Sequence, residues 1–435
     1  MDVIITGAGP VGCYTAAILG YAGIKVGVFE KRKKRDVKKE IGIIHFDVRC
    51  YKPLNLPRPL NNKDVYIGTF EKLWQVPLNE EDKFAVDYPT DILHMNEFIN
   101  WIAKYAKESG NVEFHYETPF EAPIIEGKKV IGAKIGGNIG DVYAKITIDC
   151  SGMHAVVRNS LPEKCNVSCL IPRNERTFTV YMEKWKCTGK FPQGSNTFVS
   201  YKGFANQVGS DLTLIGTSTL KGREYTRKMH KEMVERQKLN EITHTIVETL
   251  EGEVPYDFPP SSLVGDGFLS IGDAAFQNKP YNGEGIASGM EAANLALPII
   301  VGALKKQDVS RENLWDYNVS FFRGFGADFV MIRGAGETLV ELNSDEFNWM
   351  FENGFIDKSM LFSTFTTYKA GISTGLIKSA IKGFKNRTLF KKILRGIRLG
   401  MALSRLYKNY PKDPSKLPDW EKKWAKTCRA CYQQD

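Results

Sequence analysis

The sequence predicts an α/β fold with an N-terminal parallel sheet, an inserted mixed sheet and a C-terminal helical region. Residues 3–5 form a β-branched run, and a glycine-rich turn then leads into helix-forming residues 14–19. A second apolar run over residues 24–29 completes a strand–helix–strand unit, which is typical of parallel sheets. Strand-like runs continue to residue 271, whereas basic and helical segments dominate after residue 357.

The length of the chain, 435 residues, exceeds what one hydrophobic core usually supports, so we expect two or three interleaved subdomains. The longest apolar stretches, such as residues 292–304, are too short or too interrupted to span a bilayer, which needs roughly 20 apolar residues. The N-terminus lacks the basic segment and cleavage site of a signal peptide. We therefore expect a cytoplasmic protein without a transmembrane span.

The eight cysteines are scattered along the chain, which favours reduced thiols over a disulfide framework. Cys428 and Cys431 form the only close pair with the spacing of metal ligands. A zinc site normally needs four ligands, and no second pair of matching spacing stands nearby. The sequence therefore predicts no metal site.

The turn after the first strand reads GAGPVG over residues 7–12. In this pattern Gly7 permits the tight turn, Gly9 lets the backbone approach a pyrophosphate, and Gly12 lets helix and strand pack closely. The N-terminus of the following helix adds partial positive charge. Glu30 ends the second strand, where it would accept hydrogen bonds from ribose hydroxyls. The motif predicts a Rossmann-like dinucleotide site but does not distinguish FAD from NAD.

A second segment, residues 147–158, has a strand that ends on Asp149 and is followed by Gly152 and Arg158. By itself this pattern is weak, because an acidic residue and a glycine follow many strands. Its meaning depends on the segments that precede and follow it.

A third segment, residues 270–286, begins at a strand end with Gly272 and Asp273. Asp273 can bind a ribityl hydroxyl there, and the glycine-rich loop before the next helix can offer backbone amides to a flavin ring or a pyrophosphate. The sequence thus has three candidate cofactor-binding segments.

In this order and spacing, the three segments resemble the FAD-binding signatures of the para-hydroxybenzoate hydroxylase-like flavoprotein superfamily, over residues 1–55, 94–160 and 262–300. Within it, the spacing of the third segment is similar to that of the geranylgeranyl reductase branch, which saturates isoprenoid double bonds. The resemblance implies FAD as the cofactor. The implied cofactor-binding residues are Gly7, Gly9, Val11, Gly12, Glu30, Asp149, Gly152, Gly272, Asp273, Pro280, Gly283, Gly285 and Ile286.

The resemblance also organises the domains. We expect a first part of the FAD-binding domain over residues 1–164, a substrate domain with a mixed sheet over 165–258, a second part of the FAD-binding domain over 259–304, and a basic helical region over 305–435.

The sequence differs from the geranylgeranyl reductase branch at one residue and in two segments. Met95 stands where the branch usually has an arginine near the FAD. Residues 40–47 replace its cysteine-bearing loop, which makes His45 a candidate near the flavin and Cys50 a candidate equivalent of the cysteine. The branch's motif for the lipid pocket is not recognisable in residues 192–201.

Charge is distributed unevenly along the chain. Residues 358–412 contain thirteen Lys or Arg and no Asp or Glu, and residues 31–39 form a shorter basic run that we expect to be a solvated loop. Apolar residues recur at helical spacing at Phe390, Ile393, Leu394, Ile397 and Met401. Two interpretations stay open for this helix: it lies on an anionic membrane surface, or its apolar stripe packs on the protein's own core.

The leading functional hypothesis from the resemblance is an FAD-dependent reductase of unsaturated isoprenoid lipids, whose electron donor is ferredoxin or NAD(P)H and whose catalytic residues are not identified. The alternative is a flavin-dependent monooxygenase of a small or aromatic compound. A halogenase is disfavoured because its Trp-x-Trp-x-Ile-Pro pattern is absent. A third hypothesis is a peripheral membrane protein in which FAD is only structural. A nucleic-acid partner is not expected, since the basic stretch has no recognisable motif.

Overall fold

The computed structural model describes residues 1–37, 42–78, 82–168, 177–188, 195–198, 202–208, 211–340, 342–371 and 386–432. The Cys431 side chain and parts of the segments 31–39, 40–47 and 192–201 discussed above lie outside the described residues.

The first sheet of the described chain has the strand order β16-β17-β10-β1-β2-β6. It is parallel except for β16, which is antiparallel to β17. The predicted strand–helix–strand unit is confirmed, because β1 pairs in parallel with β2. The strands are β1 (Val3–Thr6), β2 (Val26–Glu30), β6 (Val112–Tyr116), β10 (Ile146–Asp149), β16 (Val264–Gly265) and β17 (Phe268–Ser270).

Both faces of this sheet are covered, which explains why β1 is an unbroken apolar run. Val3 and Ile5 belong to the main core with the helices, whereas Ile4 packs on the opposite side against a small antiparallel sheet. The small sheet comprises β7 (Phe120–Glu126), β8 (Lys129–Ile135) and β9 (Gly140–Tyr143). The covering helices are α1 (Pro10–Tyr21), α2 (Met95–Glu108), α4 (Ile286–Lys305) and α5 (Arg311–Arg323).

The second sheet has the order β15-β11-β14-β13-β12-β4-β5-β3 among the described residues. The predicted substrate segment, 165–258, supplies β11 to β15, but the other three strands come from residues 43–94. The sheet therefore extends beyond the segment that we predicted for it. Its elements are β3 (Ile43–Asp47), β4 (Tyr66–Val76), β5 (Phe84–His94), β11 (Thr177–Cys187), β12 (Ser195–Phe198), β13 (Gly203–Gln207), β14 (Leu212–Thr219), β15 (His244–Pro255) and the helix α3 (Arg223–Arg236).

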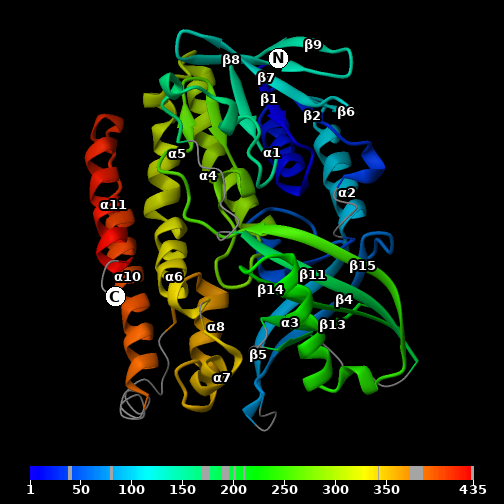
Figure 1. The fold of residues 1–435 in the computed structure, drawn as a ribbon. Helices are drawn as coiled ribbons and strands as arrows, with labels where there is room; N and C mark the ends of the chain where they lie inside the picture. Colours follow the sequence, from blue (N-terminus) through cyan, green and yellow to red (C-terminus); the bar gives the residue numbers. More distant parts are fainter. Residues whose placement is uncertain are drawn as a thin grey trace.

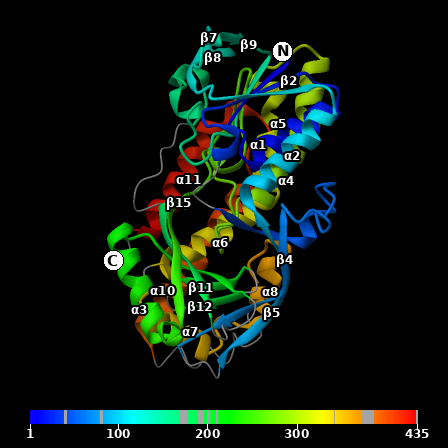
Figure 2. The ribbon, with the colours of Figure 1, turned by 90° about the vertical axis from the view of Figure 1, so that its right-hand side faces the viewer.

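Helices form the C-terminal region, as predicted, and lie beside both sheets (Figures 1 and 2). α6 and α10 approach closely because glycines meet where they cross: a Cβ on Gly334 would lie 2.7 Å from the Gly400 Cα. The helices are α6 (Phe325–Leu339), α7 (Ser344–Glu352), α8 (Lys358–Thr367), α10 (Arg387–Lys408) and α11 (Leu417–Tyr432).

The amphipathic helix predicted near residue 390 is α10, and its apolar stripe packs mainly on the protein itself. Ile393 is buried, and Phe390 and Ile397 contact the same hydrophobic cluster. Met401 is the exception, with 52% of its surface exposed. The interpretation that the apolar stripe packs on the protein's own core therefore holds for most of the stripe. The basic side of α10 stays exposed.

One helix in the described part of the chain, α4, is long and apolar enough to cross a membrane by length and composition. It packs between α1 and α5, and half of its most apolar window is buried inside the protein.

Candidate functional site

The turn after β1 contains three glycines with different constraints. Gly7 has a φ of +102°, and a Cβ there would lie 2.5 Å from the Cys150 carbonyl oxygen. A Cβ on Gly12 would overlap the Gly7 carbonyl oxygen. A Cβ on Gly9, by contrast, would meet no atom within 4 Å, and no side chain caps the N-terminus of α1 beside it. The turn is therefore tightly packed at two glycines and open at the third, where an anion can approach the helix.

Glu30 lies at the end of β2 and faces this turn. Its carboxylate accepts hydrogen bonds from the Ala8 amide and from the Arg32 amide, each at 2.9 Å. The side chain is thus held at the position where the sequence predicts a ribose contact, and that contact itself stays a prediction.

Asp149 is fully buried and bonds to its own loop. One carboxylate oxygen accepts from the Ser151 amide and hydroxyl, and the other accepts from the Val157 and Arg158 amides at 3.1 and 2.8 Å. Burial raises the pKa of Asp149, and these hydrogen bonds oppose that rise. Gly152 in the same loop has a φ of +84° and open space around its Cα. The hydrogen bonds of Asp149 hold the loop of the second segment, and Gly152 is the residue of that loop with open space beside its Cα.

Val11 joins the first and third segments. A Cβ on Gly272, whose φ is +77°, would lie 3.1 Å from Val11, and one on Gly289 would lie 2.7 Å from it. The Gly272 amide donates to the Gln277 side-chain oxygen at 2.8 Å. Segments separated by more than 250 positions thus meet around one valine.

The loop from Asp273 to α4 is held by another close approach. A Cβ on Gly285 would lie 2.5 Å from an Asp273 carboxylate oxygen, so only glycine brings the loop this near. Gly283 has a φ of +76°, and Ile286 is the first residue of α4. All predicted cofactor residues of the third segment therefore lie on one continuous loop, including Pro280.

The geometry fits a bound dinucleotide. Gly9 and Gly152 face open space at neighbouring strand ends. Near them, the buried hydroxyls of Thr6 and Ser270 have no hydrogen-bond partner among the described residues, and neither has Tyr281 in the third segment. Buried polar groups are rarely left unpaired, so these hydroxyls indicate a missing polar partner. The combination of open glycines and unpaired hydroxyls suits the FAD that the sequence predicts.

A family model described as an FAD binding domain matches residues 1–307 of the chain. The chain belongs to this FAD-binding family. Two relatives support the resemblance to geranylgeranyl reductases. A digeranylgeranylglycerophospholipid reductase 1 of Methanopyrus kandleri is 25% identical over 368 residues, covering 79% of this chain and 92% of the relative. A digeranylgeranylglycerophospholipid reductase of Sulfolobus acidocaldarius is 21% identical and covers 97% of this chain and 96% of the relative.

Solved structures confirm the fold of this flavoprotein. A geranylgeranyl bacteriochlorophyll reductase-like protein from Thermoplasma acidophilum is 17% identical with a TM-score of 0.75, covering 91% of this chain and 99% of that one. The flavin-dependent brominase Bmp2 is also 17% identical, with a TM-score of 0.65 and coverage of 89% and 99%. The predicted fold class is thus confirmed, and the family model confirms the FAD-binding family and FAD as the cofactor.

A buried ion pair lies in the FAD-binding loop. Lys279 is fully buried, and its Nζ donates to Glu284 Oε2 at 3.0 Å and to the Tyr88 hydroxyl of β5 at 3.2 Å. Tyr88 in turn donates to Glu284 at 3.1 Å. Burial opposes the charge on Lys279, but Glu284 and the other acidic groups nearby raise the pKa of Lys279 above its usual value. The lysine therefore stays charged where the FAD-binding loop meets the second sheet.

A second polar group stands beside Lys279. Glu291 of α4 accepts through Oε1 from the Tyr368 hydroxyl at 3.1 Å and from the Cys50 thiol at 3.9 Å. Lys279 lies over the Tyr368 ring, 5.2 Å from its centroid. Burial raises the pKa of Cys50 to about 12, so the thiol stays protonated.

Sequence reasoning missed most of these residues. It considered Cys50 but not Lys279, Glu284, Glu291 or Tyr368. One signal was available: Lys279 is the only cationic residue in the segment 270–286.

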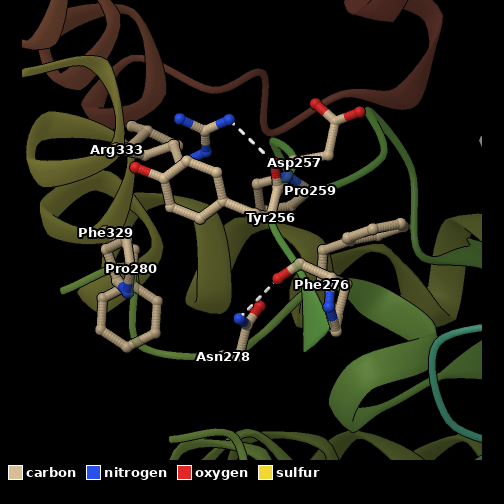
Figure 3. A pocket seen from close by; sticks show the side chains of 10 residues that line it. Tyr256, Asp257, Pro259, Phe276, Asn278, Pro280, Phe329 and Arg333 are labelled. Carbon is tan, nitrogen blue, oxygen red and sulfur yellow. Dashed lines mark hydrogen bonds between the residues drawn. The ribbon is translucent and has the colours of Figure 1, made fainter. Parts of the chain in front are cut away.

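An apolar pocket adjoins the same loop (Figure 3). Phe329 and Arg333 reach it from α6, and Arg333 lies over the Tyr256 ring at 3.4 Å from the centroid. The pocket is lined by Pro255, Tyr256, Asp257, Pro259, Phe276, Asn278, Pro280, Phe329, Val330 and Arg333. Pro280 is a wall of this pocket and the neighbour of Lys279, so apolar and polar regions meet at the FAD-binding loop.

The other candidates have clear positions. Met95 is buried at the start of α2, within the main core. His45 of β3 lies 3.3 Å from the Asn206 side-chain nitrogen, and burial lowers the pKa of His45, which favours the neutral ring. Of the segment 192–201, the structure describes β12, which pairs in parallel with β4.

Proposed function

We propose that this flavoprotein reduces carbon–carbon double bonds in isoprenoid lipid chains. The curated relatives carry the proposal, because the pocket beside the FAD-binding loop has room for only about one water molecule and includes Asp257, Asn278 and Arg333 in its lining. The names of the curated relatives, which are digeranylgeranylglycerophospholipid reductases over nearly their whole length, support it.

The chain's residues would act by binding, orienting and excluding water. FAD, when bound and reduced, supplies the hydride. The open glycines Gly9 and Gly152 would accept the cofactor, and apolar side chains beside the FAD-binding loop, such as Pro280 and Phe329, would help to keep water away.

A monooxygenase or halogenase is the competing function, since the fold alone is shared with a brominase. A chlorinase of Pseudomonas fluorescens is 23% identical and covers 73% of this chain, whereas relatives named as reductases cover 79% and 97% of it, which favours the reductase.

Attachment to an anionic membrane is part of the proposal, since the substrate would be a membrane lipid. On α10, Arg387, Lys391, Arg398 and Arg405 are exposed, and no carboxylate of the described residues lies within ion-pair distance of them. Such unneutralised charges favour an anionic surface. Lys391→Glu with Arg398→Glu should reduce sedimentation with anionic vesicles, whereas Lys104→Glu with Lys134→Glu, an equal change in charge elsewhere, should not.

Mass spectrometry of the lipid product tests the function. The protein, with FAD and dithionite under anaerobic conditions, should add two hydrogens for each double bond of a digeranylgeranyl lipid. A product that gains oxygen in air, with none formed anaerobically, would favour the monooxygenase. Dithionite avoids assuming either ferredoxin or NAD(P)H as the natural electron donor.

A further inference from the structure

The reductase reaction needs a proton donor as well as a hydride donor. Saturating an alkene breaks one π bond and forms two C–H bonds, one from a hydride and one from a proton. The hydride from reduced FAD carries both electrons, so the second carbon needs an acid. We propose that the carboxyl group of Glu291 is this acid and that Tyr368 and Cys50 position it. This inference rests on the proposed function.

The position of Glu291 supports the assignment. It lies in the second turn of α4, the helix that follows directly on the FAD-binding loop. Its Oε1 is held by the Tyr368 hydroxyl and the Cys50 thiol, which come from two other parts of the chain. Its other oxygen, Oε2, makes no hydrogen bond to the described residues. One oxygen is thus anchored, and the other is available to carry a proton.

Tyr368 connects Glu291 to the apolar pocket. Its hydroxyl bonds to Glu291, while its ring packs edge-on against Phe329 with 5.5 Å between centroids. Phe329 itself lines the pocket, as does Pro280 next to Lys279. Tyr368 therefore joins the carboxyl group of Glu291 to a residue that lines the pocket.

The surroundings of Glu291 balance opposing effects. Burial raises the pKa of Glu291, while the Tyr368 hydrogen bond and the charge of Lys279 stabilise the carboxylate and oppose that rise. A general acid works best when such effects hold its pKa near the working pH. After the proton leaves, the Tyr368 and Cys50 donors and the Lys279 cation face the new carboxylate. Water returns the proton when the product leaves.

Other titratable groups face the same space. Lys279 and Glu284 belong to the FAD-binding loop, and Tyr88 belongs to β5. Asp47 at the end of β3 pairs with Arg49 at 2.7 Å. Because Lys279 pairs with Glu284 and Arg49 with Asp47, Glu291 is the carboxyl group of this cluster that forms no ion pair with a described residue.

Infrared spectroscopy of the FAD-loaded protein at pH 7 tests the state of Glu291 without turnover. The wild-type spectrum should contain the C=O band of a protonated carboxyl that is missing in Glu291→Gln. The control Glu312→Gln, which removes an exposed carboxylate on α5, should retain the band. If the wild-type and Glu291→Gln spectra coincide in this region, Glu291 is ionised and the proposal is wrong.

A single-turnover reaction tests the role in catalysis. Reduced wild-type protein is mixed anaerobically with digeranylgeranyl lipid, and flavin reoxidation is followed. Glu291→Gln should slow this step by roughly 100-fold or more, the usual contribution of a general acid, with unchanged FAD affinity and unchanged reduction by dithionite. Tyr368→Phe should slow it less and shift its pH profile, because Tyr368 only positions the acid.

The infrared and single-turnover measurements distinguish a failure of this inference from a failure of the proposed function. If Glu291→Gln reoxidises as fast as wild type, the proton donor is another group and the inference is overturned. If the lipid does not reoxidise the wild-type flavin, the proposed function fails, and the infrared band alone then decides whether α4 carries a protonated acid.

Discussion

Gly9→Ala should separate cofactor binding from folding, because the added methyl group would meet no protein atom within 4 Å. Gly9 has a φ of −68° and a ψ of 176°, which alanine adopts readily. We therefore expect the free energy of unfolding of the apoprotein to change by no more than about 0.5 kcal/mol, as at other unconstrained positions. The methyl group would instead occupy the space through which the pyrophosphate approaches the turn.

The size of the binding loss follows from packing. Forcing an extra methyl group into a close-packed contact costs about 1–3 kcal/mol. At 1.4 kcal/mol for each tenfold change, this makes FAD binding roughly 5- to 150-fold weaker. Titration of FAD into the apoprotein, followed by flavin fluorescence, measures the affinity, and urea unfolding of the apoprotein measures the stability.

Two glycine variants act as controls. Gly252→Ala, at another open position in β15, should change neither quantity. Gly7→Ala should lower both, because its Cβ would lie 2.5 Å from the Cys150 carbonyl oxygen and its φ is +102°. The reasoning is refuted if Gly9→Ala binds FAD like wild type, or if it destabilises the apoprotein as much as Gly7→Ala.

Three further variants test the interior. Asp149→Asn should lower the free energy of unfolding by about 1–3 kcal/mol, seen in urea unfolding, because an amide cannot accept all four hydrogen bonds. Burial raises the pKa of Glu183, but His230, 3.4 Å away, and hydrogen bonds from Trp185 and Tyr181 outweigh it and hold the pKa at about 2, below the ordinary 4.5. The resulting stability is present above pH 4.5 and lost as the pH falls toward 2, so Glu183→Gln should flatten the pH dependence by about 1–2 kcal/mol between unfolding at pH 6 and pH 3. Lys279→Met should cost about 3–5 kcal/mol by leaving Glu284 unpaired, and adding Glu284→Gln should recover part of it in a double-mutant cycle.

Each of these has a contradicting result. An unchanged unfolding midpoint for Asp149→Asn would mean that its four hydrogen bonds do not hold the loop. A wild-type pH profile in Glu183→Gln would remove Glu183 as the acid-sensitive group. Additive losses for Lys279→Met and Glu284→Gln would show that the two side chains do not interact.

The glycine turns were predictable from sequence because their requirements are local. Gly7 and Gly12 each serve contacts within a few residues or at the end of one neighbouring strand, and their spacing therefore persists as a motif. The strand–helix–strand unit was predictable for the same reason, and β1 indeed pairs in parallel with β2.

The extent of the second sheet and the polar groups at the FAD-binding loop were not predictable in the same way. β12 pairs with β4, which precedes it by more than 110 positions, and no local pattern specifies that pairing. Tyr88 reaches Glu284 across 196 positions, and Tyr368 reaches Glu291 across 77. These contacts depend on tertiary packing alone, so the residue types gave no sign of them. The basic side of α10, in contrast, followed directly from helical spacing.

The most direct test of the account is the fate of reduced flavin without oxygen. The protein is reduced with dithionite, freed of excess reductant, and mixed with a geranylgeranyl lipid or with its fully saturated counterpart while the flavin absorbance is followed. We predict reoxidation by the unsaturated lipid and none by the saturated one. Flavin that stays reduced with both lipids, and reoxidises only when air is admitted, would contradict the account.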